Sequence, residues 1–125
     1  MASEREKDVQ KGDIVAFPRI GYTHYGIYVG GGKIIHFDGS KDQNDAIIRI
    51  DDLHEVAGSS EYRVCNKLDQ VHKPFLPTEI VSRAESMLGY SNYNISFDNC
   101  EHFAAWCRYG IAASDQSRKC LDALD

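Results

Sequence analysis

The stretch YTHYGIYVGGGKIIHF, residues 22–37, decides the fold class. It holds two β-prone runs joined by three glycines, which is the pattern of a β-hairpin. Further short strands are predicted at 13–19, 46–50 and 61–67, helices at 76–89, 98–110 and 114–124, and a helical turn or loop at 51–58. Strands followed by helices favour an α+β domain, with an antiparallel sheet and the helices packed on one side.

The length and charge of the chain limit its function. Its 125 residues suit a single domain, for which we expect a flexible N-terminal segment at 1–10 and a folded domain at 11–125. A formal net charge of -5 argues against binding of nucleic acid. The sequence has neither an apolar leader nor an apolar run of the roughly 20 residues that span a membrane. We therefore expect a cytoplasmic protein with reduced thiols.

A cysteine stands at the start of a second informative stretch, DNCEHFAAWCRYG, residues 98–110. The stretch predicts an amphipathic helix with Asp98 or Asn99 as its N-cap. A helix N-terminus and an adjacent imidazole both lower the pKa of a thiol, and unpaired N–H groups there can stabilise an oxyanion. Cys100 is thus a candidate nucleophile with a lowered pKa. The competing interpretation is a buried structural thiol, since free cysteines are often buried.

Two histidines of the hairpin are candidates for the base. His24 and His36 lie in its two arms, and a turn near Gly31 would bring them roughly opposite one another. One could take the thiol proton while the other orients it. His102 is only two residues from Cys100, and about 200° of helical rotation turns it away. A zinc site with Cys100 and both hairpin histidines would have suitable ligands, but no close ligand pair anchors it, so no metal is predicted.

Together, GDIVAFPRIGYTHYGIYVGGGKIIHF and NCEHFAAWCRYG resemble the lecithin:retinol acyltransferase family. The resemblance is closest to its branch of phospholipase A/acyltransferases, also described as Ras-suppressor-like, and it runs from about Lys11 to Gln116. It implies the circularly permuted papain-like fold of the NlpC/P60 superfamily, in which the histidines precede the cysteine in the chain.

The resemblance also implies a role for each site residue. Cys100 would be the nucleophile, His24 the general base and His36 the residue that orients it, with Tyr22 and Asn99 supporting the oxyanion. The implied activity is that of a thiol phospholipase A1/A2 and acyltransferase, which forms a thioester from a glycerophospholipid ester. The acyl group would pass to water, to an amine such as that of phosphatidylethanolamine, or to a hydroxyl, for example of a lysophospholipid. No cofactor is required.

The sequence departs from the family pattern in three places. The stretch between His36 and the EVAG segment is short, no C-terminal hydrophobic anchor is present, and the insert associated with retinol specificity is missing. We therefore expect peripheral contact with membranes through Phe17, Ile20 and Tyr25, and no retinol esterification. Two alternatives stay open: a catalytically weak interaction module in signalling or defence, and an amidase or peptidase that uses the same thiol.

Overall fold

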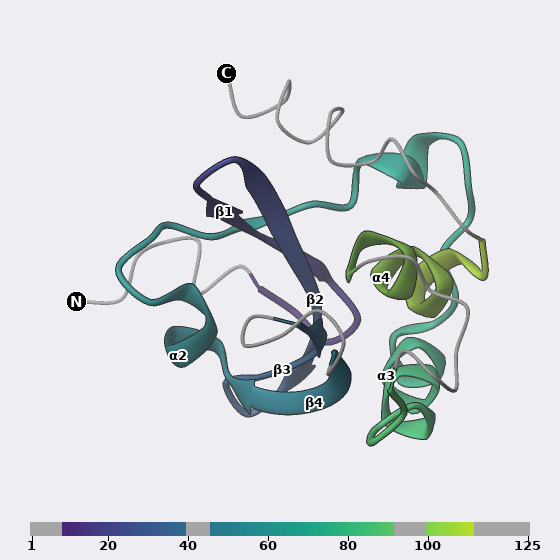
Figure 1. Ribbon diagram of the computed structural model, residues 1–125. Helices are drawn as coiled ribbons and strands as arrows, with labels where there is room; N and C mark the ends of the chain where they lie inside the picture. The colour runs from purple at the N-terminus through teal and green to yellow at the C-terminus, as the bar shows by residue number, and fades with distance from the viewer. Residues whose placement is uncertain (1–8, 40–45, 92–99, 112–125) are drawn as a thin grey trace.

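A five-stranded antiparallel sheet forms the centre of the molecule (Figure 1). The computed structural model describes residues 9–39, 46–91 and 100–111. The strand order is β4-β3-β2-β1-β5. The strands are β1 (Ile14–Arg19), β2 (Tyr22–Gly30), β3 (Lys33–Asp38), β4 (Ile47–Asp52) and β5 (Arg63–Val64). The predicted hairpin is the β2–β3 pair, and the predicted α+β class with an antiparallel sheet is confirmed.

The helices are α2 (Leu53–Ala57), a 3-10 turn η2 (Lys67–Gln70), α3 (Pro77–Ser86) and α4 (Cys100–Tyr109). α3 begins at Pro77, because proline is well suited to the first helical position. α4 ends before Gly110, whose φ of 75° only glycine adopts without strain. The predicted caps of α4 and the predicted helix at 114–124 lie outside the described residues.

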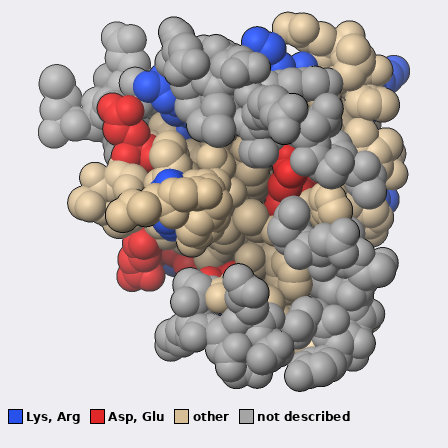
Figure 2. Space-filling view, turned by 45° about the horizontal axis from the view of Figure 1, so that its top comes forward, with Lys and Arg blue, Asp and Glu red and all other residues tan. Residues whose placement is uncertain are grey.

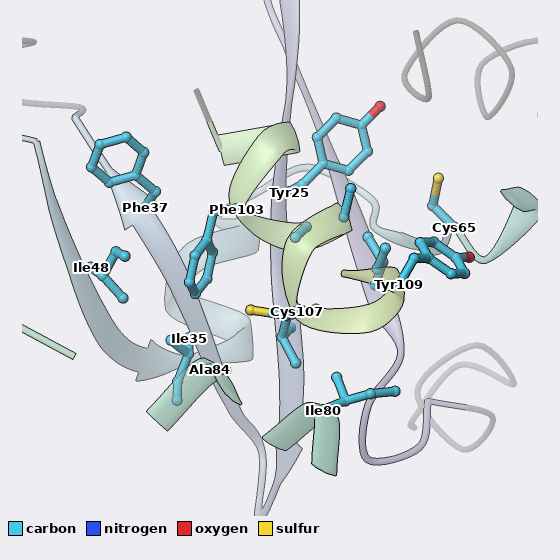
Figure 3. Close-up of a cluster of buried hydrophobic side chains, with 14 of the residues drawn as sticks. Tyr25, Ile35, Phe37, Ile48, Cys65, Ile80, Ala84, Phe103, Cys107 and Tyr109 are labelled. Atoms are coloured by element: carbon cyan, nitrogen blue, oxygen red, sulfur yellow. The ribbon is translucent and has the colours of Figure 1, made fainter. Parts of the chain in front are cut away.

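The two faces of the sheet are covered by different helices (Figure 1). Successive side chains of a strand point to opposite faces, so Ile14 and Ala16 of β1 face α3 and α4, whereas Val15 and Phe17 face α2. The larger core lies under α4, where Phe103 and the other side chains labelled in Figure 3 are packed. The two long helices thus share one face, as predicted, and the short α2 covers the other.

Three further findings concern the ends and the thiols. The segment 1–10 was predicted to be flexible, and only its residues Val9 and Gln10 are described. The side chain of Val9 is buried in the core beneath α2. Cys100 and Cys107 are free thiols, whereas Cys65 is disulfide-bonded. The prediction of reduced thiols is therefore wrong at Cys65. Within the described part of the chain, every helix is too short or too polar to cross a bilayer.

Candidate active site

His24 and His36 are diagonal neighbours on one face of the hairpin. His36 lies directly opposite Gly26, two residues along β2 from His24, so the two histidines, predicted to be roughly opposite one another, are diagonal neighbours. Side chains two residues apart on a strand share a face, and a diagonal separation is within reach of an imidazole. His24 Nε2 lies 2.8 Å from His36 Nδ1, and the two rings meet edge to face.

His24 is held as a neutral ring. It packs beside Phe17, with 6.1 Å between the ring centroids. Burial lowers the pKa of His24 to about 3, and the neighbouring His36 and Arg19 act in the same direction, while Asp38 opposes them. A buried imidazole loses the hydration that stabilises its charged form. His24 is thus a proton acceptor, not an imidazolium, at neutral pH.

The peptide groups of β2 alternate between its two edges. Tyr28 N–H donates to Asp13 O, so the even-numbered residues of β2 bond toward β1, and the odd-numbered residues point their peptide groups toward β3. β3 pairs with β2 only from Gly26 onward, whereas β1 pairs with it from Tyr22. Among the described residues, no strand pairs with the β3-side edge of β2 on either side of His24.

Cys100 lies at this edge of β2. Its Sγ donates a hydrogen bond to the carbonyl oxygen of Thr23, at 3.9 Å. His24 leans toward the same side of β2, because its partner His36 belongs to β3. Sulfur and imidazole thus lie at the same edge of β2. His24 shares the sheet face of its pair partner Phe17, which α2 covers, whereas Cys100 belongs to α4 on the other face. Within the described residues, the hydrogen bond of Sγ goes to the carbonyl oxygen of Thr23 and not to His24.

The Cys100 thiol is protonated in this setting. Burial raises the pKa of the thiol above the ordinary value, and the Glu101 carboxylate raises that pKa further. The backbone N–H groups of Tyr25, Cys100 and Glu101 lower the pKa, but their effect is smaller than that of burial. The prediction of a lowered pKa is therefore wrong. The predicted N–H groups at the start of the helix are present, but loss of hydration has the larger effect.

A family model described as "Lecithin retinol acyltransferase" matches residues 7–113. The chain belongs to this family. Human "Phospholipase A and acyltransferase 2" is 38% identical over 84% of this chain and 74% of its own length. Human "Phospholipase A and acyltransferase 3" is 35% identical over 90% of this chain and 78% of its own length. Human "Lecithin retinol acyltransferase" is 33% identical over 91% of this chain and 60% of its own length.

The residues predicted to support the oxyanion or to contact a membrane differ in their exposure to solvent. Tyr22 begins β2 with its side chain 60% exposed, and Asn99 lies outside the described residues. The prediction that Phe17 and Tyr25 contact a membrane is wrong, because both side chains are buried in the core. Ile20, in the turn between β1 and β2, is fully exposed.

Asp51 is a site residue that the sequence analysis missed. His36 Nε2 lies 2.8 Å from Asp51 Oδ2, so the hydrogen bonds of the histidine pair continue into β4. The strand was predicted to end at residue 50, whereas β4 extends to Asp52. The available signal was the alternation of side chains along β4, which places Arg49 and Asp51 on the same face.

Proposed function

We propose that this family member is a cysteine-dependent phospholipase A and acyltransferase that acts on glycerophospholipids. The observation that carries the proposal is that the hydrogen-bonded pair of His24 and His36 and the Cys100 sulfur meet at the same edge of β2. A neutral base next to a protonated thiol is suited to attack that is coupled to proton transfer. The names of the relatives support the same chemistry.

In the first half-reaction, the Cys100 sulfur attacks the carbonyl carbon of the ester while its proton passes to His24 Nδ1. His24 Nε2 is already engaged with His36, so Nδ1 is the ring nitrogen left to receive the proton. The backbone N–H groups of Tyr25, Cys100 and Glu101 already act on the sulfur, which places them to stabilise the oxyanion. The intermediate expels the glycerol oxygen, which takes the proton from His24, leaving an acyl thioester and a lysophospholipid.

In the second half-reaction, His24 removes a proton from the incoming nucleophile. Water yields a free fatty acid, which is the phospholipase outcome. The amine of phosphatidylethanolamine yields an N-acyl product, and the hydroxyl of a lysophospholipid yields an ester. In each case the new bond to the acyl carbon replaces the thioester bond, the sulfur regains its proton from His24, and no cofactor takes part.

The turn between β1 and β2 is the element we assign to contact with the membrane. Ile20 is fully exposed there, and Tyr22, the first residue of β2, is mostly exposed. Tyr22 directly precedes Thr23, whose carbonyl oxygen accepts a hydrogen bond from the Cys100 thiol. On the face shown in Figure 2, acidic and basic side chains both appear among uncharged ones, with neither sign covering the face. Because the formal net charge is -5 and Ile20 is fully exposed, apolar insertion fits this protein better than attraction to anionic lipids.

Vesicle binding tests the assignment of this turn. Burial of an isoleucine side chain is worth about 1.5–3 kcal/mol, so Ile20→Asp is expected to weaken co-sedimentation with phosphatidylcholine vesicles by about tenfold or more. Val71→Asp is the matched control, because Val71 is an exposed aliphatic residue of another element. Equal binding by both variants would remove the turn from the proposal.

Intact-mass analysis tests the chemistry. Incubation with a short-chain phosphatidylcholine is expected to add one acyl group at Cys100 and to release lysophosphatidylcholine. Cys100→Ser should abolish the adduct, whereas Cys107→Ala should retain it, because Cys107 is a fully buried free thiol of the same helix. Absence of both adduct and lysophospholipid would favour the interaction module, and turnover of a peptide amide alone would favour the amidase.

A further inference from the structure

A chain of hydrogen bonds runs diagonally across three strands of the sheet. It begins at His24 on β2, passes through His36 on β3 and reaches Asp51 on β4, with 2.8 Å between the bonded atoms at each step. Arg49 Nε lies 3.0 Å from the same Asp51 oxygen, and Arg49 Nη1 lies 3.8 Å from Asp38 Oδ2. Asp51 is therefore held from one side by a guanidinium and from the other by an imidazole.

When His36 is neutral, the carboxylate determines the direction of every bond in the chain. An ionised carboxylate only accepts hydrogen bonds, so His36 Nε2 must carry a proton. A neutral imidazole has a single N–H, which leaves His36 Nδ1 as an acceptor. His24 Nε2 must then donate to it. The proton of His24 is thus on Nε2, and the lone pair is on Nδ1, where a base is needed.

We propose that Asp51 is a positioning residue of the active site, which keeps His24 in the tautomer that accepts a proton at Nδ1. This inference rests on the proposed function, since it concerns the base of that reaction. When His24 takes the thiol proton, its Nε2–H continues to donate to His36, and the Asp51 carboxylate stabilises the positive charge through His36. Asp51 itself gains no proton. Arg49 holds the carboxylate in place.

A bound cation is the competing explanation for this cluster. One ligand atom each from His36, Asp38 and Asp51 lies within 4.8 Å of the other two. A metal ion would need the lone pair of His36 Nε2 and would exclude the proton on which the tautomer depends. Arg49 already supplies positive charge to both carboxylates. Activity that is unchanged by EDTA agrees with the hydrogen-bonded chain, whereas loss of activity that zinc restores would overturn it.

The tautomers can be measured directly by NMR of ¹⁵N-histidine-labelled full chain. In the wild-type protein, His24 and His36 are each expected to show a protonated Nε2 and an unprotonated Nδ1. Asp51→Ala should give His24 a mixture of tautomers, and Asp51→Asn should largely preserve the tautomer, because an amide oxygen still accepts from His36. Asp52→Ala is the matched control, since Asp52 pairs with Lys33 and takes no part in the chain.

Kinetics with a monomeric short-chain phospholipid complete the test. Asp51→Ala is expected to lower kcat about 10- to 100-fold with little change in KM, Asp51→Asn less so, and Asp52→Ala not at all. A wild-type His36 protonated at Nδ1, or an Asp51→Ala variant with unchanged tautomer and kcat, would refute the proposal. If the wild-type protein turns over no lipid, the proposed function fails, while the NMR result still decides whether Asp51 sets the tautomer of His24.

Discussion

Gly26 lies directly opposite His36, and a methyl group on Gly26 would stand 2.4 Å from Ile34 Cγ2 and 3.2 Å from His36 Cβ. β2 and β3 are thus packed too closely at this pair to admit any side chain on β2. The missing side chain also leaves the space through which His24 reaches His36 along the diagonal.

Gly26→Ala is expected to push β3 away and to break the bond between His24 and His36. Overpacking of this kind costs about 1–3 kcal/mol, so both the free energy of unfolding and the rate of lipid turnover should fall. Gly58→Ala is the control, because Gly58 has a φ of 63° but open space around it, so it loses stability through backbone strain alone. Equal retention of activity by both variants would contradict the prediction.

Cys100 should react slowly with iodoacetamide at neutral pH. Its pKa is raised above 9.0, and only the thiolate is alkylated, so the reactive fraction appears as the pH rises through that higher value. The rate of modification at Cys100, followed by peptide mapping, should still increase above pH 9. A free NCEHF peptide should reach its plateau at a lower pH. A protein whose plateau comes before that of the peptide would contradict the raised pKa.

Acid should destabilise the fold through His24. Its pKa is about 3 in the folded protein and 6.5 in the reference state, so between these values the unfolded chain binds a proton that the folded chain does not. The stability that neutral His24 contributes is fully present above the unfolded-state pKa of 6.5. That contribution is lost as the pH falls toward the folded-state pKa of about 3. We expect about 2–3 kcal/mol of loss between about pH 7 and pH 4 from this group. In urea unfolding, the free energy of unfolding of His24→Gln should fall less between about pH 7 and pH 4 than that of the wild-type protein. Equal decreases in the two proteins would refute the assignment to His24.

Arg83 joins α3 to α4 through its guanidinium. The group lies 4.6 Å from the ring of Phe75 and 3.9 Å from the ring of Trp106, and its Nε and Nη2 donate to Trp106 O. Arg83→Lys keeps the charge but loses the planar stack and one donor, so we expect about 1–2 kcal/mol of destabilisation in urea. Arg63→Lys, at an ion pair with the exposed Glu61, is the control and should cost far less. Similar losses in both variants would contradict this role.

The sequence predicted the hairpin, the two long helices and the family, because each depends on local patterns of residues. It did not predict the diagonal placement of His24 and His36, since the register of a hairpin depends on how the glycine turn closes. It also missed Asp51, whose importance appears only when β4 is paired with β3.

Burial explains the other differences between sequence and structure. Phe17 and Tyr25 lie three residues from the exposed Ile20 and Tyr22, respectively, yet strand alternation turns both into the core. The same limitation affects Cys100, because the position of a thiol at a helix start is visible in the sequence, whereas the loss of water around its sulfur is not. Tertiary packing thus reversed the direction expected for its pKa.

The hydrogen bond from Cys100 to the carbonyl oxygen of Thr23 has a consequence for the lifetime of the protein in a cell. Peroxide oxidises thiolates far faster than it oxidises thiols, so a sulfur kept in its protonated form is slow to become a sulfenic acid. The catalytic power of the proposed nucleophile would then be available only when a lipid is bound, and the resting protein would be spared oxidative inactivation.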